Sequence, residues 1–192
     1  MSSPSTNKPI KLVGLITVVA GIIMVVAGGV TWSLVTTQLK AEQITVAAVS
    51  DAAPGSLAGK PVAGPFTAYA QANAINHHAL KEANGRTYAQ LGADAKTLKA
   101  KLAAAGASPE AIAKDAGVVA LADSRTNSMT GSFLRASLFT SVISFGVAAL
   151  AIGLGVLFAL LGFALIKVGT PTADPVSSTN RAGNADPVVA TA

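Results

Sequence analysis

Two long apolar blocks dominate the hydrophobic pattern of this chain. No charged residue occurs between Leu12 and Val35, and none occurs between Ala136 and Ile166. At about 1.5 Å of rise per residue, each run forms a helix long enough to cross a hydrocarbon core of about 30 Å. We therefore predict two membrane-spanning helices, at residues 12–36 and 138–166.

The second block is too long for a single upright crossing. A helix of about 30 residues measures about 45 Å, which exceeds the usual hydrocarbon thickness. Its first part is also the more polar, because it carries Ser137, Thr140, Ser141 and Ser144. We expect this helix to begin outside the hydrocarbon, with the core crossing at about residues 143–166.

The segment between the blocks, residues 37–137, carries helix formers and helix-terminal signals. An alanine-rich stretch follows Pro65 and ends at Gly85, a residue type favoured just beyond a helix C-terminus. The predicted fold class is therefore mainly α, with two transmembrane helices flanking a small, mostly helical extracytoplasmic domain. The termini, residues 1–11 and 167–192, are predicted to be polar tails, and the second is expected to be disordered because it has few large apolar residues.

Shorter elements are predicted inside this domain. A β-like run at residues 43–46 precedes a Pro- and Gly-rich loop at residues 53–65. One helix is predicted at residues 94–105, and another at residues 109–122 with Ser108 as its N-cap. The polar residues 123–131 are expected to form a hinge into the second membrane helix.

Short basic flanks predict the orientation in the membrane. Lys8 and Lys11 precede the first apolar block, and Lys167 follows the second. Short basic flanks stay cytoplasmic, whereas loops longer than about 60 residues are translocated largely regardless of charge. We predict a multi-pass protein of the cell membrane with both termini cytoplasmic, although Arg125 and Arg135 on the outer flank oppose this rule.

A cleaved signal peptide is the alternative for the first block. Apolar regions of signal peptides span about 7–15 residues, and this run is longer. Small residues at Ala27, Gly28 and Gly29 would nevertheless permit cleavage. An uncleaved anchor is the favoured interpretation.

Small residues recur along both apolar blocks with a period close to 3.5. Gly14, Gly21 and Gly28 fall seven residues apart in the first block. The matching positions of the second block are Ser141, Ser144, Ala148, Ala151, Gly155 and Gly162. A 3.5-residue repeat keeps one stripe facing one partner, and small residues let helix backbones approach closely in lipid. These residues are predicted to pack helices together, against each other, a second copy or another membrane protein.

Composition and charge exclude several classes of function. Charged residues make up 12% of the chain, against about 25% in soluble domains. The net charge is +5, but the basic residues are scattered and form no basic–aromatic cluster, so no nucleic-acid partner is predicted. The absence of cysteine excludes disulfides, thiol catalysis and cysteine-ligated metals.

No catalytic, cofactor or metal site is predicted. His77 and His78 are neighbours, so on a helix they point about 100° apart. His78 and Glu82 share a face, but two ligands are too few for a stable metal site. The sequence GSLAGKP at residues 55–61 is one residue short of a phosphate loop and has proline in place of Ser or Thr.

Seven short segments together form a distinctive set: TW (31–32), QITV (43–46), GPFTAYAQA (64–72), INHHAL (75–80), GRTYAQL (85–91), SFLRASLFTSV (132–142) and FGV (145–147). With these segments the chain resembles an uncharacterised family of small actinobacterial membrane proteins with two membrane helices. The resemblance covers most of the chain except both tails and residues 93–125, and it implies an envelope-associated protein of the cell membrane. Similar sequences sometimes carry the automatic label of aromatic ring-opening dioxygenase. Such enzymes need an iron site built from several histidines and carboxylates, whereas this chain has one adjacent histidine pair.

Three hypotheses for function follow. The leading one is a non-enzymatic accessory or scaffold protein of the cell envelope, whose partners are the lipid bilayer and either a second copy or an envelope membrane protein. The second is an oligomeric channel or permease subunit, although no charge lies within either apolar block to mark an ion path. The third is a metal-dependent enzyme subunit completed by a partner, with His77, His78 and Glu82 contributing.

Overall fold

A computed structural model describes residues 8–170, and helices account for most of that part of the chain. The five helices are α1 (Lys8–Ala41), α2 (Pro65–Glu82), α3 (Tyr88–Ala104), α4 (Pro109–Lys114) and α5 (Ala116–Val168). The prediction of a mainly helical chain with two long apolar helices is confirmed for the described residues. The predicted tails lie largely outside them, although residues 8–11 belong to α1 and Lys167 belongs to α5.

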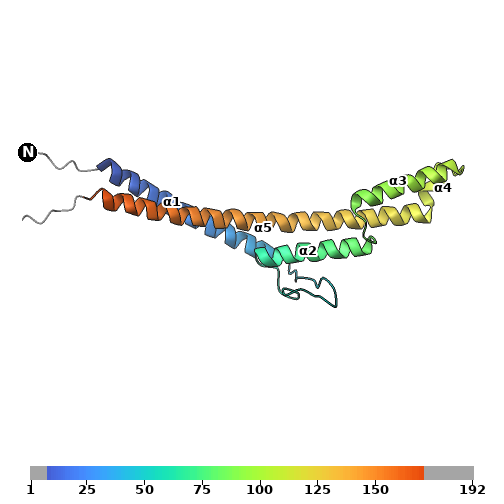
Figure 1. Cartoon of the computed structure of the whole chain (residues 1–192), viewed down its shortest axis with the longest axis horizontal. Coiled ribbons are helices and arrows are strands. Elements are labelled where there is room, and N and C mark those ends of the chain that lie inside the picture. The colour runs from blue at the N-terminus through green and yellow to red at the C-terminus, as the bar shows by residue number, and fades with distance from the viewer. Residues whose placement is uncertain (1–7, 171–192) are drawn as a thin grey trace, which may run out of the picture.

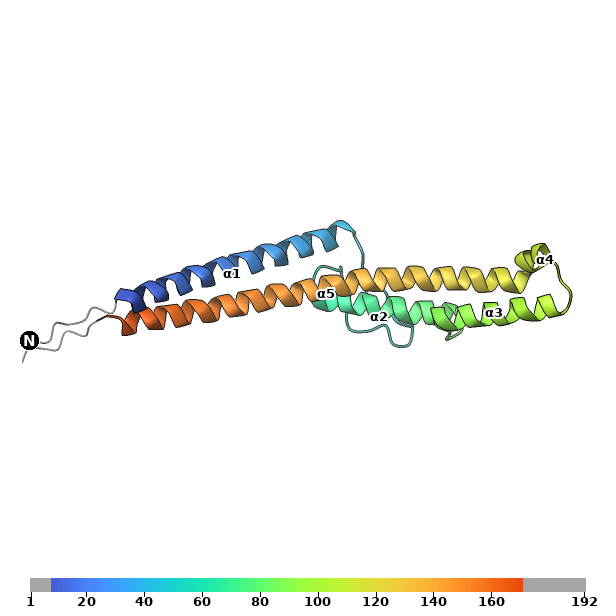
Figure 2. The same ribbon diagram turned by 90° about the horizontal axis from the view of Figure 1, so that it is seen from above.

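Helix α5 is the axis of the molecule. It contains 53 residues and is therefore about 80 Å long. Figure 1 shows α1 beside one half of α5, and α2, α3 and α4 gathered around the other half. The chain runs outward along α2 and α3, turns at α4 and returns as α5 (Figure 2). Helices α2, α3 and α4 thus lie along a different half of α5 from α1, and we call them the outer helices.

Both α1 and α5 are long and apolar enough to cross a membrane. In the most apolar window of each helix only 11% of the residues are buried inside the structure. The core helix of a soluble protein would be mostly covered by its neighbours, so this exposure is typical of a surface that contacts lipid. The exposed side chains include Leu12, Ile16, Ile23, Val26, Ile143, Leu150, Leu160 and Phe163.

The predicted hinge at residues 123–131 is wrong, because this segment is a continuous part of α5. Ser128 and Gly131 are buried, and a methyl group added at Gly131 would lie 3.2 Å from Ala79 Cβ of α2. The hydroxyl groups of Thr126 and Thr130 donate to carbonyls four residues earlier in the same helix. Packing against α2 therefore keeps this polar stretch helical.

The helix predicted at residues 109–122 is also corrected. Its N-cap is as expected, since Ser108 Oγ accepts a hydrogen bond from Ala111 N at 3.2 Å. However, α4 ends at Lys114. The side chain of Asp115 then caps a new helix by accepting from the backbone N–H groups of Gly117 and Val118, at 3.0 and 3.1 Å. This second cap starts α5.

The largest apolar core lies where α1 ends and α2 begins. Side chains from α1, the following loop, α2 and α5 meet there, and we call this group the junction core. Its buried members are Leu39, Val46, Val62, Ala68, Ala72, Leu138 and Phe145. The predicted β-like run forms one side of it through an isolated antiparallel bridge between Thr45 and Pro61. On the side toward the middle of α1, the Trp32 ring meets the Phe145 ring edge-on, with centroids 4.8 Å apart.

Candidate functional site

The three glycines of α1 face small residues of α5 in an antiparallel register, and we call this contact the glycine seam. Gly14 lies against Gly162, Gly21 against Gly155, and Gly28 against Ala148. Each step of seven residues up α1 matches a step of seven residues back along α5. The partner of the first predicted stripe is therefore the second helix of the same chain.

The two backbones approach so closely along the seam that no side chain fits. A methyl group added at Gly21 would lie 2.5 Å from Gly155 O and 2.7 Å from Ala159 N. One added at Gly162 would lie 2.5 Å from Gly14 O. By contrast, methyl groups added at Gly29 or Gly153 would meet nothing within 4 Å. Only one face of each helix requires glycine.

The remaining predicted seam residues differ in burial. Ala148 is buried, whereas Ser141, Ser144 and Ala151 are only partly buried. The Ser141 and Ser144 hydroxyl groups donate to the carbonyls of Ser137 and Thr140 in their own helix, at 3.3 and 2.9 Å. Backbone carbonyls of α5 thus satisfy these hydroxyls.

Phe145 is the α5 residue that the small-residue pattern missed. It is 1% exposed and packs against Trp32, just beyond the contact of Gly28 with Ala148 that ends the seam. It lies seven residues after Leu138, which is also buried, and seven residues before the half-buried Ile152. A search for any residue type at a spacing of seven, and not for small residues alone, would have found it.

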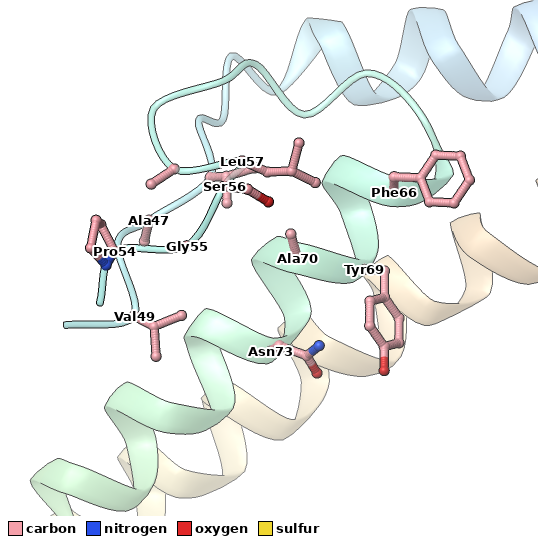
Figure 3. A pocket seen from close by; sticks show the side chains of 12 residues that line it. Ala47, Val49, Pro54, Gly55, Ser56, Leu57, Phe66, Tyr69, Ala70 and Asn73 are labelled. Carbon is pink, nitrogen blue, oxygen red and sulfur yellow. The ribbon is translucent and has the colours of Figure 1, made fainter. Parts of the chain in front are cut away.

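A pocket of about 320 Å³ lies beside the junction core, between the loop and the start of α2 (Figure 3). Its lining residues are Val46, Ala47, Val49, Pro54, Gly55, Ser56, Leu57, Ala58, Phe66, Tyr69, Ala70 and Asn73. Polar side chains are limited to one hydroxyl from serine, one phenol and one amide. No acid, base or histidine lines this loop pocket, so its chemistry suits an apolar ligand and not acid–base catalysis.

The loop wall of this pocket is fixed by hydrogen bonds. The Oε1 atom of the buried Gln71 accepts from Ala47 N at 2.7 Å, across 24 positions of sequence. Gly59 N donates to Val46 O at 2.8 Å, with Gly59 at a positive φ of 75° that other residue types adopt only with strain. The loop is thereby held against α2.

The histidine pair lies on α2, with ring centroids 6.2 Å apart. His78 and Glu82 line an open groove together with Asn127 and Thr130 of α5. Within residues 8–170, no group of three or more histidine and carboxylate side chains could hold a metal ion. Of the residues of the third hypothesis, His78 and Glu82 thus share a groove that His77 does not line, and the three do not complete a metal site by themselves.

A scan against protein-family models, a search of curated proteins and a search of solved structures each gave no match.

Proposed function

We propose that the protein is a non-enzymatic accessory protein of the cell envelope that acts as a membrane-anchored stalk. The observation that carries this proposal is the continuity of α5. The same helix packs against α1 through the glycine seam and against α2 and α3 further along, so no joint separates the anchor from the outer part. If Phe145 lies at the outer hydrocarbon edge, the 29 positions from Ala116 to Ser144 reach about 45 Å above it. Such a stalk would hold a partner at a fixed height.

The proposed orientation places both termini in the cytoplasm. Lys8 and Lys11 of α1 lie at the same end of the hairpin as Lys167 of α5 (Figure 1). A methyl group added at Gly169 would lie 2.8 Å from the Lys11 side chain, which shows how close the two helix ends are. Three lysines gathered at one end support a cytoplasmic location for that end.

Single-cysteine labelling tests this orientation, because the natural chain contains no cysteine. Lys99→Cys on α3 should react with a membrane-impermeant maleimide on intact cells. Lys8→Cys should react only after lysis, and the two exposed lysines serve as matched controls for each other. The reverse labelling pattern would refute the orientation. The intact mass of the purified protein separately tests the signal-peptide alternative, which requires loss of the first segment.

Exposed apolar side chains outside the predicted crossings support contact with a protein partner. Phe66 and Phe133 are 80% and 66% exposed. Tyr69 and Leu134 are also exposed. Exposed apolar side chains that gather into a patch are typical of surfaces that bind another protein. We propose an envelope or membrane protein as the partner, in line with the family that the sequence resembles.

Photo-crosslinking in the native membrane tests the partner. A photoreactive residue at Phe133 should give one defined adduct, whereas one at the exposed Lys99 should give none. Purification in mild detergent should retain the same partner. A monomer with no adduct and no co-purifying protein or lipid would contradict the scaffold proposal. An adduct with the mass of two copies would replace the heterologous partner with a homo-oligomer.

No observation in the described residues favours the channel alternative. Hydroxyl groups at the start of the second apolar block are the polar groups that a pore could use, and those of Thr140, Ser141 and Ser144 donate to carbonyls of their own helix.

A further inference from the structure

A second, polar pocket lies where α2 and α3 meet the outer half of α5. Its volume is about 100 Å³, and it is separate from the loop pocket. Its lining residues are Asn76, Ala79, Leu80, Arg86, Thr87, Tyr88, Ser128, Ser132 and Arg135. We call it the arginine pocket.

The polar part of this lining carries positive or no charge. It consists of two guanidinium groups, two serine hydroxyls, a threonine hydroxyl, a phenol and an amide. The Ser132 and Thr87 hydroxyls already donate to Ser128 O and Gln90 Oε1, so the guanidinium groups, the Ser128 hydroxyl, the phenol and the amide supply the donors. None of the lining residues is an acid. A site with this donor set attracts an anion and repels a metal cation.

Arg135 is the central cation of the arginine pocket. Its Nε atom is buried and has no hydrogen-bond partner among the described residues. Within the same part of the chain no carboxylate forms an ion pair with it, and its guanidinium lies 5.8 Å from the centroid of the Phe139 ring. A buried donor without a partner carries an energetic cost that an arriving acceptor would remove.

The other arginines of the described chain gather at the same corner. Arg86 lines the pocket and also pairs with Asp94 at 2.9 Å, in a partly exposed ion pair. Arg125 lies over the Tyr88 ring, 4.2 Å from its centroid, and does not line the pocket. All other basic residues in residues 8–170, apart from the two histidines, are lysines. Arginine binds phosphate through two parallel hydrogen bonds, which a lysine cannot reproduce.

We propose that the arginine pocket binds a phosphate-ester group. Its volume equals about three water molecules at ~30 Å³ each, which suits one phosphate group. Two sources share this chemistry, a phospholipid headgroup and a soluble phosphate ester. Arg135 precedes Phe145 by ten positions, or about 15 Å along α5, so the headgroup source additionally rests on the proposed orientation.

Binding to the purified full-length protein tests the site. In an uncharged detergent and phosphate-free buffer, calorimetric titration with glycerol phosphate probes the soluble source. Titration with a short-chain phosphatidic acid, against diacylglycerol with the same acyl chains, probes the headgroup source. Saturable binding of either phosphate compound is expected, and which of them binds more tightly identifies the source. Absence of binding by both would overturn the proposal.

A matched pair of variants distinguishes phosphate binding in the arginine pocket from a general attraction of anions to positive charge. Arg135→Gln should weaken binding at least about tenfold, because it removes a charge-assisted donor from the pocket. Arg125→Gln removes the same charge just outside the pocket and should leave the affinity nearly unchanged. Equal weakening in both variants would overturn the proposal.

Ser128→Ala removes a buried hydroxyl of the pocket but keeps every charge, so it guards against misfolding of the arginine variant and should weaken binding a few-fold. Unchanged binding in both Ser128→Ala and Arg135→Gln would also overturn the proposal. Helicity by circular dichroism and Trp32 emission verify the fold of each variant. Glycerol phosphate binding in detergent does not depend on membrane orientation, so this test and the cysteine labelling can fail independently.

Discussion

Helix α1 packs against α5 in two different ways along its length. In the glycine seam the contact is backbone on backbone, with Gly21 and Gly155 at its centre. In the junction core, large side chains such as Leu39, Leu138 and Phe145 fill the space between the elements. Close approach of small residues gives the seam its backbone packing, which is the contact that the proposed lipid environment favours. Burial and close packing of large apolar side chains stabilise the core.

The two regions should therefore respond to opposite kinds of substitution. Added volume should damage the seam, and removed volume should damage the core. Trp32 is the single tryptophan and touches Phe145 between the two regions, so its emission reports on both.

The largest effect is expected from added volume in the seam. Gly28→Leu should separate α1 from α5, because even a methyl group there would lie 2.7 Å from Ala148 O. Gly28→Ala should cost about 1–3 kcal/mol by overpacking. Thermal unfolding in detergent, followed by Trp32 emission, measures both. The neighbouring Gly29→Leu is the control, since Gly29 faces open space. Equal effects at the two positions would show that the seam does not hold the hairpin.

Removed volume in the junction core should have the next largest effect. Phe145→Ala should destabilise the protein by about 3–5 kcal/mol, through lost burial and a residual cavity. Chemical denaturation followed by circular dichroism measures it. Phe163→Ala is the matched control, because Phe163 is exposed on the same helix. If the control cost as much, the distinction between buried and lipid-facing aromatics would be wrong.

A smaller effect should follow from one polar contact at the edge of the core. Gln71→Leu leaves Ala47 N without its acceptor and should cost about 1–3 kcal/mol. The loop at residues 47–60 should then exchange its amide hydrogens faster. His77→Leu changes an exposed side chain on the same helix that does not line the loop pocket, and it should leave loop exchange unaltered. Unchanged exchange in Gln71→Leu would mean that other contacts hold the loop.

The smallest effect is expected from the ion pair of Arg86 and Asp94. Both side chains are more than 40% exposed, at 42% and 44%, so water and salt screen their attraction. Asp94→Asn should change the free energy of unfolding by less than about 1 kcal/mol. Asp123→Asn, at an exposed acid without an ion pair among the described residues, provides the baseline for the same denaturation measurement. A loss of several kcal/mol would place this pair in the same class as the junction core.

Much of the fold could be predicted from local patterns. Uncharged runs mark the two apolar helices, and capping residues such as Ser108 mark a true helix start. The hinge prediction failed because residues 123–131 are polar by composition, while their helical state depends on burial of Ser128 and Gly131 against α2. That contact joins segments about 50 positions apart, and no local pattern indicates it.

Local sequence patterns likewise predicted one part of the candidate sites and missed the part that depends on contacts between distant segments. The period of seven predicted which face of α1 carries the seam, but not whether its partner was in the same chain. The arginine pocket could not be predicted, because Arg86 lies in the turn between α2 and α3, Arg135 lies on α5, and no local spacing links them. Phe145 was missed because it is large within a stripe of small residues.

Because α5 is one continuous helix, the buried face of its first half is held at a fixed rotation relative to the buried face of its second half. Buried positions at Gly131, Leu138 and Phe145 face the outer partners and the upper end of α1, and those at Gly155 and Gly162 face the glycines of α1. One residue inserted between Phe145 and Gly155 would turn one half relative to the other by about 100° and move it by about 1.5 Å. A seven-residue insertion would nearly restore the angle. The number of residues between Phe145 and Gly155 is therefore constrained. Helix α5 can become longer or shorter there only by whole seven-residue repeats if both halves are to keep their contacts.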